Sequence, residues 1–414
     1  MNVSRNKLIR IIEYIIAFLF IIDCHSLYGI VYNFGNTINN LLVGLMILYI
    51  IFILPNSQQY IMVETIEISG IISVYLGIYG VLTHQTVNFY RLLIIVVLMI
   101  WIIKLGPTKN GLPNLLVAYG KILSIVAAIS LFFWLFGSFL RIIKPSGVVY
   151  SSWGARSGNY NALPTYFNLY FESQDNDLNL SIFQGVAKNT AIFSEAPMAA
   201  LNFSIGLLTQ LFNKKSKWDK CRKIVLILGI LSTFSITGYI FLLLLAMIRI
   251  GIQNKAKMSN NFRYFIVILS LVCVIAAVSF LYNSKINANM ASVSVRKDDY
   301  KVGLRAWLSS PLLGIGIQNY TGLKNFMESW RYFNTGFSNS VMDILSGGGL
   351  YLAAGYLFCF VKGIINSYRY NKNKLVFIIL MFYLFVTTFF TYTDILLFCI
   401  VWFASKSQNK LEVQ

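Results

Sequence analysis

The chain has 414 residues, of which 57% are apolar and 12% are charged, and its net charge is +19. Its mean hydropathy is +0.67. Soluble domains carry about 25% charged residues and lack long uncharged apolar runs, so this composition excludes an ordinary soluble protein and predicts an integral membrane protein. The apolar runs are long and unbroken rather than alternating, which also excludes the strands of a membrane β-barrel.

The charge and the cysteines exclude further classes of protein. Most basic residues lie in short loops between apolar runs, where membrane topology requires them, so the positive charge does not indicate nucleic acid. The five cysteines show no pairing pattern, which argues against a disulfide framework and against a zinc site. The first apolar run lacks a convincing cleavage site and reads as an uncleaved membrane helix.

The first half of the chain predicts six membrane helices and one long loop. The first five spans are predicted at residues 8–31, 37–54, 61–82, 90–105 and 114–139. A first long loop, 141–190, is rich in Ser, Asn, Tyr and Gly, and a sixth span follows at about 191–212.

The second half contains two apolar runs that are too long for one helix, because about 20 residues cross a bilayer. We divide 224–252 at the polar stretch 232–238, and 375–405 at the polar stretch 387–394. Further spans are predicted at 264–282 and 341–361, separated by a second long loop, 283–340. The predicted fold is an all-α polytopic membrane protein of about 12 transmembrane helices (10–12), forming a single integral membrane domain over residues 1–414.

The distribution of Lys and Arg orients this arrangement. With both termini in the cytoplasm, most basic residues fall in inner loops, and both long loops become extracytoplasmic. If 224–252 were one helix, Lys255, Lys257 and Arg263 would move outside, so the charge pattern favours the hairpin.

The second long loop carries the strongest candidate site. Arg296, Lys297, Lys301 and Arg305 lie within ten residues, ahead of an apolar segment broken by Pro and Gly. We predict an anion site here; the alternative is a solvated loop with local ion pairs. The apolar neighbours of Arg305 predict packing against the membrane face, which would let its guanidinium group bind two phosphate oxygens.

The first long loop combines aromatic, amide and basic side chains. Its basic residues are Arg141, Lys144 and Arg156, and its aromatic residues are Tyr150, Trp153, Tyr160, Tyr166, Tyr170 and Phe171. Flat aromatic faces with amides and hydroxyls suit a sugar-binding surface; the alternative is an aromatic belt at the membrane interface.

One carboxylate enters an apolar helix from the predicted outer side. Glu195, if partly desolvated there, could act as a general base. The alternative is a charge favoured by the helix dipole at an N-terminus, with Pro197 in the first turn. Asp23 and Asp394 are predicted intramembrane acids that could pair with Lys121 or with an arginine. No acid pair in the outer loops has metal-ligand spacing, so no metal or other cofactor is implied.

Three short motifs resemble the bacterial superfamily of O-antigen and capsular polysaccharide polymerases (Wzy-type) and O-antigen ligases. The motifs are K-x-x-A-x-F-x-E at 188–195, R-A-W-L-S-S-P-L-L-G-I-G at 305–316 and F-S-N-S-V-M-D-I-L-S-G-G-G at 337–349. Three positions depart from the family pattern. Lys188 replaces arginine, Ala191 replaces glycine, and Ser338 stands where ligases and many polymerases carry histidine.

The resemblance implies an all-helical glycosyltransferase of the GT-C type in the bacterial cytoplasmic membrane, with its active site facing outside. Its substrate would be an oligosaccharide on undecaprenyl pyrophosphate, and a flippase and a chain-length regulator could be partners. Glu195 would be the base and Arg305 the main pyrophosphate group. The other implied binding residues are Arg141, Arg156, Lys188, Arg296, Lys301 and Asn339. An O-antigen-ligase-type transferase and a lipid-linked oligosaccharide flippase are the alternatives.

Overall fold

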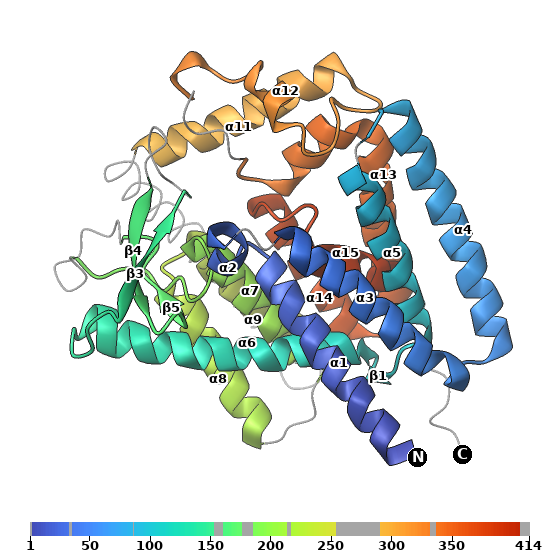
Figure 1. The fold of residues 1–414 in the computed structure, drawn as a ribbon, viewed down its shortest axis with the longest axis horizontal. Helices are drawn as coiled ribbons and strands as arrows, with labels where there is room; N and C mark the ends of the chain where they lie inside the picture. Colours follow the sequence, from blue (N-terminus) through green and yellow to red (C-terminus); the bar gives the residue numbers. More distant parts are fainter. Residues whose placement is uncertain are drawn as a thin grey trace. The chain divides into compact units, whose positions relative to one another are not determined.

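A computed structural model describes residues 2–32, 35–85, 87–152, 160–175, 185–212, 217–253, 290–331 and 337–405 (Figure 1). The predicted span at 264–282 lies outside these residues. The chain divides into two compact units. Unit 1 comprises Met1–Ile122, Asp298–Tyr370 and Phe389–Gln414, and unit 2 comprises Leu123–Lys297 and Asn371–Thr388.

Unit 1 is built from helices and short helical turns. They are α1 (Asn2–Asp23), α2 (Leu27–Val31), α3 (Gly35–Ile53), η1 (Leu54–Asn56), α4 (Gln59–Leu82), α5 (Val87–Leu105), α12 (Tyr320–Lys324), η4 (Ser329–Arg331), α13 (Ser340–Tyr368) and α15 (Asp394–Ala404). A two-residue antiparallel pair, β1 (Thr108–Lys109) and β2 (Leu112–Pro113), precedes α6. The boundary between the units falls within α6 (Asn114–Phe133) and within α11 (Met290–Ser309).

Unit 2 combines helices with a small sheet. Its helices are η2 (Trp134–Phe139, a π-helical turn), α7 (Ala196–Thr209), α8 (Lys217–Ser232), α9 (Ile236–Gln253) and α14 (Lys372–Thr387). The strands β3 (Gly147–Ser151), β4 (Asn161–Tyr166) and β5 (Tyr170–Phe171) form an antiparallel sheet in the order β3-β4-β5. The sheet is a departure from the all-α prediction.

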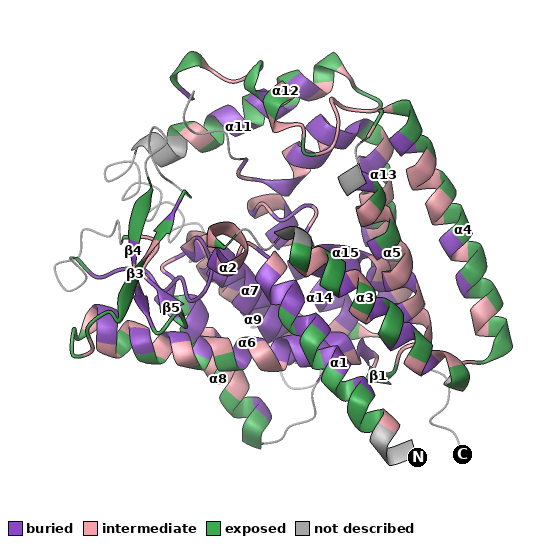
Figure 2. Ribbon diagram, viewed as in Figure 1, coloured by how far each residue is buried: buried purple, intermediate pink, exposed green. Residues whose placement is uncertain are grey.

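The described residues contain three helices that are long and apolar enough to cross a membrane. They are Gln59–Leu82, Asn114–Phe139 and Ser340–Tyr368. Exposure differs sharply among the apolar helices. Helix α4 leaves large apolar side chains such as Ile71 and Val74 exposed, whereas α7 is almost entirely buried (Figure 2). An exposed apolar face suits contact with lipid, and an all-round apolar helix suits a protein core.

Both divisions of the overlong apolar runs are confirmed. Helices α8 and α9 are separated by residues 233–235, and α14 ends at Thr387 before α15 begins at Asp394. The polar residues at each break compete for backbone hydrogen bonds and favour turns over continued helix.

Two predicted segments differ from expectation in unit 1. The part of the chain expected to be a second long loop contains the 20-residue helix α11. The span predicted at 341–361 is the longer helix α13, which is interrupted at Gly349 by a non-helical backbone conformation (φ 59°, ψ −163°).

Several helix ends that were predicted to share one side of the membrane meet within unit 1. The amide of Asp394 donates to the Asp23 carboxylate (3.0 Å), which joins the end of α1 to the start of α15. The amide of Phe390 donates to Ser340 Oγ (3.0 Å), at the start of α13. These contacts place the end of α1 beside the start of α15, and the start of α13 beside the turn that precedes α15.

Lys121 and an arginine were the predicted partners of Asp23 and Asp394. Lys121 Nζ donates to the Tyr14 hydroxyl (2.9 Å), and the Asp23 carboxylate accepts from the backbone amide of Asp394 (3.0 Å). The arginine alternative is met at Asp394, on which the positive charge of Arg91 acts.

Candidate functional site

The candidate site in unit 1 is organised around the interruption of α13. A broken helix leaves backbone amides and carbonyls without their usual partners, and these groups are costly if buried. Segment 311–316, the Pro/Gly part of the motif that begins at Arg305, supplies the partners through four hydrogen bonds. They are Ile315 N to Ser346 O (2.8 Å), Gly316 N to Gly347 O (3.0 Å), Leu350 N to Pro311 O (2.9 Å) and Tyr351 N to Leu312 O (2.9 Å).

Glycines at this junction are required by geometry. Gly314 has φ +70°, and a Cβ there would lie 2.5 Å from the backbone of Gly347. Gly349 has φ +59°, and a Cβ there would lie 2.4 Å from the carbonyl oxygen of Leu312. Both positions therefore combine a left-handed backbone with a contact too close for any side chain. The two motifs of the second loop form one structural element, which we call the glycine junction (residues 311–316 and 346–351).

Helix α4 fixes the glycine junction from the side. The Tyr79 hydroxyl lies 2.8 Å from the carbonyl oxygen of Gly347 and 3.1 Å from that of Leu313. Tyr79 is one turn from the C-terminal end of α4, so the junction lies at that end of unit 1.

Arg305 lies on α11, close before the junction. Its Nη1 is 3.2 Å from Glu328 Oε1, and the arginine side chain is 52% exposed. A surface carboxylate positions this guanidinium within the protein, and its packing against a membrane face stays a prediction. An exposed ion pair is weak, so the arginine can exchange its carboxylate partner for an anion that binds it more strongly. Arg296 and Lys301 are exposed on the same helix.

A second arginine of this region is buried in an ion cluster that the sequence reading treated as solvated. Arg331 Nη1 lies 2.6 Å from Asp299 Oδ1 and 3.2 Å from Asp298 Oδ2, and the Arg331 and Asp299 side chains are inaccessible. Burial raises the pKa of Asp299, against the opposing effects of a hydrogen bond from Ser338 and the positive charge of Arg331. The spacing of Asp298 and Asp299 with Val302 and Ala306 marks the buried face of α11 and could have revealed the cluster.

The start of α13 contributes two buried polar side chains. Asn339 caps the helix, its Oδ1 accepting from the Met342 amide (2.8 Å). One turn later, Asp343 is 3% exposed, near Thr391, Tyr320 and Tyr356. Asn339 was a predicted binding residue. Asp343 lies in the same motif, but no role was predicted for it.

The candidate site in unit 2 is built by the motif at 188–195, which runs beside residues 171–174. The Lys188 amide donates to the Gln174 carbonyl (2.9 Å), and the Phe171 amide donates to the Ala191 carbonyl (3.0 Å). Gln174 Oε1 accepts from the amide of Ala196, at the start of α7 (3.0 Å). The motif is thus fixed by backbone pairing as well as by its side chains.

The motif turns at Ala191, which has a left-handed backbone (φ +50°). This is the position at which the polymerase superfamily carries glycine, the residue that adopts such a conformation at least cost. The fully buried Asn189 holds the turn. Its Oδ1 accepts from the Ala191 amide (3.1 Å), and its Nδ2 donates to Ser232 Oγ (2.8 Å) and Ser130 Oγ (3.2 Å).

The two charged residues of this motif occupy different environments. Glu195 is the half-buried N-cap residue of α7, and its carbonyl accepts from the Met198 and Ala199 amides (3.1 Å each). Lys188 is buried, with 5% of its surface exposed. Glu195 therefore lies at the N-terminus of a helix, as expected for a charge that the helix dipole favours. It is also partly accessible to a ligand.

A further carboxylate, Glu172, was missed by the sequence reading. Its Oε1 accepts from Ser138 Oγ (2.6 Å) and from the Tyr166 hydroxyl (3.0 Å), and Ser138 also contacts the Tyr170 hydroxyl (3.1 Å). Burial, together with the negative charge of Glu172, raises the pKa of Tyr166. The partners come from η2 and β4, and no sequence spacing links them.

The aromatic residues of the first loop separate into two groups. Tyr166, Tyr170 and Phe171 are buried, while Tyr150 and Tyr160 are 65% and 68% exposed. Of these described aromatic residues, only the exposed pair is accessible to a ligand. Arg141 Nη2 donates to the Gly185 carbonyl (3.0 Å). Arg156 and Trp153 lie outside the described residues.

The structure thus groups the predicted site residues by unit. Arg305, Lys301 and Asn339 belong to unit 1, and α11 continues to Arg296. Glu195, Lys188 and Arg141 belong to unit 2. Within the described ranges, no three His, Cys, Asp or Glu side chains are grouped so that they could hold a metal ion.

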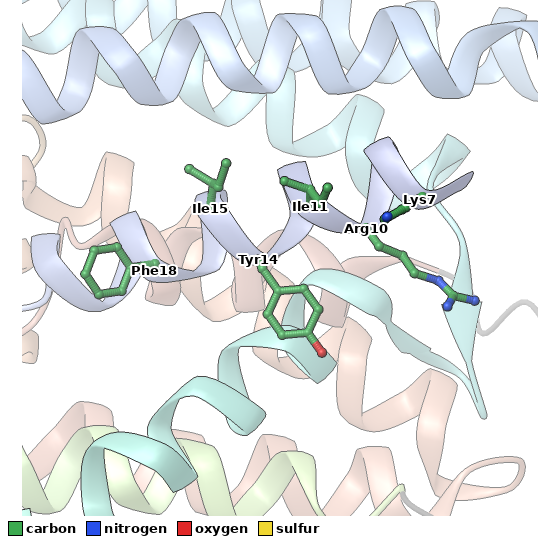
Figure 3. A pocket seen from close by; sticks show the side chains of 6 residues that line it. All are labelled: Lys7, Arg10, Ile11, Tyr14, Ile15 and Phe18. Carbon is green, nitrogen blue, oxygen red and sulfur yellow. The ribbon is translucent and has the colours of Figure 1, made fainter. Parts of the chain in front are cut away.

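A separate open groove lies along α1, on unit 1 (Figure 3). Lys7 and Arg10 line one end, and the apolar side chains of Ile11, Ile15 and Phe18 continue from them along the helix. This arrangement suits a lipid at the edge of a membrane helix, and it contains no carboxylate that could act as a base.

No protein-family model matches this chain, and no curated protein matches it.

Proposed function

We propose that the chain is a polymerase of bacterial surface polysaccharide. It would transfer a growing glycan from undecaprenyl pyrophosphate onto a lipid-linked repeat unit at the outer face of the cytoplasmic membrane. The observation that carries the proposal is the glycine junction. The junction joins two motifs that resemble the polymerase superfamily, 305–316 and 337–349. Backbone hydrogen bonds hold them together a few residues after Arg305.

The reaction needs a group that neutralises the leaving pyrophosphate. The bond between the donor sugar C1 and a pyrophosphate oxygen breaks, and its electron pair leaves with the lipid diphosphate. Arg305 is the proposed partner of that charge, since it is exposed and its present partner, Glu328, is a surface carboxylate. Arg296, Lys301 and Arg156 would add to the positive potential.

The reaction also needs a base for the acceptor sugar. The hydroxyl oxygen forms the new bond to C1, and its proton passes to a carboxylate. Glu195 is the proposed base, because it lies half-buried at the entrance to α7 and is partly accessible. Glu172 is better suited to holding acceptor hydroxyls, since Ser138 and Tyr166 already fix one of its oxygens.

The proposed membrane arrangement has about twelve spans in a GT-C-type fold, with both long loops outside. Three other predicted binding residues keep a role in the proposed site. Lys188 and Asn339 stabilise its architecture, and Arg141 contributes to the site itself. Tyr150 and Tyr160 would contact sugar rings. Ser338 in place of histidine disfavours the O-antigen-ligase-type reaction.

One observation favours transport of a lipid-linked oligosaccharide as a second candidate function. Interrupted helices and buried acids are features of transporters, and this chain has the break in α13 and the buried Asp343 in the turn that begins the helix. Transporters use the free backbone groups at such breaks to bind substrate. Here segment 311–316 occupies those groups, which is why we prefer the polymerase.

Deletion of the gene in its host, with analysis of surface glycan length, tests the proposed function. A polymerase deletion leaves single repeat units on the cell surface, and re-expression of the chain restores long polymer. Accumulation of repeat units on the cytoplasmic side would instead establish the transporter. Epitope tags in 283–340 that are accessible only from the cytoplasm would contradict both the orientation and the reaction.

A further inference from the structure

The exposed face of α11 carries two parallel rows of side chains. Lys297, Lys301 and Arg305 recur every four residues, and Arg296 adds another exposed cation beside them. Tyr300, Leu304 and Leu308, also four residues apart, are 48%, 44% and 61% exposed. Residues at this spacing lie along one strip of a helix, so a cationic row and an apolar row run side by side.

The opposite face of α11 is anchored in unit 1. Arg331 holds Asp298 and Asp299, and the buried Val302 and Ala306 belong to a cluster with Leu323. The rotation of the helix about its axis is therefore fixed, and the two rows are the face directed away from the protein of that unit.

Charge and shape identify the kind of partner that fits these rows. Both acids of α11 are on the anchored face, and among the described residues no carboxylate lies within ion-pair distance of Lys297 or Lys301. A purely cationic face would suit any anion. The adjoining apolar row favours an amphipathic surface, the boundary between phosphate headgroups and acyl chains.

The position of α11 agrees with such a surface. Its motif continues directly into the glycine junction, which Tyr79 fixes at the C-terminal end of α4, one of the helices long enough to cross a membrane. The exposed Trp330 belongs to the same region, and tryptophan is enriched at membrane interfaces.

We propose that α11 lies on the bilayer surface and docks on anionic phospholipid. Tyr300, Leu304 and Leu308 enter the headgroup boundary, and Lys297 and Lys301 extend to lipid phosphates. This contact is with the surrounding bilayer lipid rather than with the lipid diphosphate substrate, and it does not depend on the proposed polymerase activity.

Depth-dependent fluorescence quenching of the full chain in nanodiscs tests the proposal. Leu308→Cys, in a background with the five native cysteines replaced, is labelled with an environment-sensitive dye. Nanodiscs contain phosphatidylcholine alone or with about 30% phosphatidylglycerol. We expect quenching by lipids brominated near the headgroup, about twofold stronger with phosphatidylglycerol and reduced by about 1 M salt.

A charge variant separates the anionic contribution from simple proximity. Lys297→Gln/Lys301→Gln in the labelled background should lose the increase that phosphatidylglycerol causes. Equal quenching in both lipids would overturn the anionic contact, and a label that is never quenched would overturn the docking altogether. Energy transfer between labels on two copies, without lipid quenching, would show that a second chain covers the face instead.

Discussion

Arg305 and Arg331 both contact carboxylates in the region that follows the start of α11, yet their environments are opposite. Arg331 is inaccessible and lies between Asp298 and Asp299, while Arg305 is half exposed beside the single carboxylate of Glu328. A buried arginine cannot give up its partners without leaving uncompensated charges in a low dielectric. An exposed arginine can exchange one carboxylate for a phosphate at little cost.

Exposure therefore decides which of these two arginines can bind a ligand. Arg331 fixes η4 against α11, and thereby holds the helix on which Arg305 is presented. Arg305 has the exposure and the weak partner that a substrate-binding cation needs. Variants of Arg331 should therefore affect stability, and variants of Arg305 should affect activity.

Replacing Arg331 is the change with the largest expected effect on stability. Arg331→Met leaves two buried carboxylates without their cation and should lower the free energy of unfolding by about 3–5 kcal/mol. The measurement is unfolding of the purified protein in detergent. The triple variant Asp298→Leu/Asp299→Leu/Arg331→Met should recover most of the loss, because no buried charge remains. An unchanged midpoint in Arg331→Met would show that the cluster is not buried.

Gly314→Ala tests the junction that follows Arg305. The new methyl group would meet the backbone of Gly347 at 2.5 Å with φ at +70°, so we expect a loss of about 2–3 kcal/mol. Gly70→Ala in α4 is the matched control, since nothing lies within 4 Å of a Cβ there. That variant should be neutral or more stable by up to about 1 kcal/mol. Equal behaviour of the two variants would argue against the close packing of the junction.

The pH dependence of stability should report the buried Asp299. Because burial raises its pKa, Asp299 stabilises the fold most below the ordinary pKa of an aspartate, and this contribution is lost as pH rises through the raised value. Wild type should therefore lose stability relative to Asp299→Asn as pH rises from 4 to 7. A difference that stays flat, or that grows with pH, would show that the positive charge of Arg331 outweighs burial.

Arg305→Ala should have the smallest effect on stability. Its ion pair with Glu328 is exposed at both ends, so unfolding should change by less than about 1 kcal/mol. Glu328→Gln should behave in the same way. A loss as large as that of Arg331→Met would mean that Arg305 is also a structural arginine, and the comparison would fail.

Much of the helical organisation could be predicted because apolar runs and polar breaks are local signals. The divisions near 232–238 and 387–394 follow from the limit on helix length in a bilayer and from turn-forming residues. The sheet β3-β4-β5 differs from the prediction because its pairing joins residues far apart in the chain, such as Gly147 and Thr165. Helix α11 lies in a segment that was predicted to be a loop. Its many charged residues made the amphipathic pattern of the helix hard to recognise in the sequence.

The candidate site was less predictable, because its contacts join distant positions. The cluster of Arg331 spans more than 30 residues, and Ser138 reaches Glu172 across 34. The motifs contain the glycines at 314, 316 and 349. The sequence alone does not show that two backbones meet there, which is the reason that glycine is required. Ala191 shows the reverse case, in which a left-handed turn occurs at a residue that gives no such signal.

Polymerisation by purified protein is the most direct measurement of the central claim, that exposed Arg305 neutralises the lipid diphosphate. Wild type and variants would receive lipid-linked repeat units, and chain length would be read on gels, with folding checked by the unfolding midpoint. We predict no polymer from Arg305→Ala, little from Arg305→Lys because a point charge cannot make two directed bonds, and retained activity in Glu328→Gln. Polymer of wild-type length and amount from folded Arg305→Ala would contradict the account.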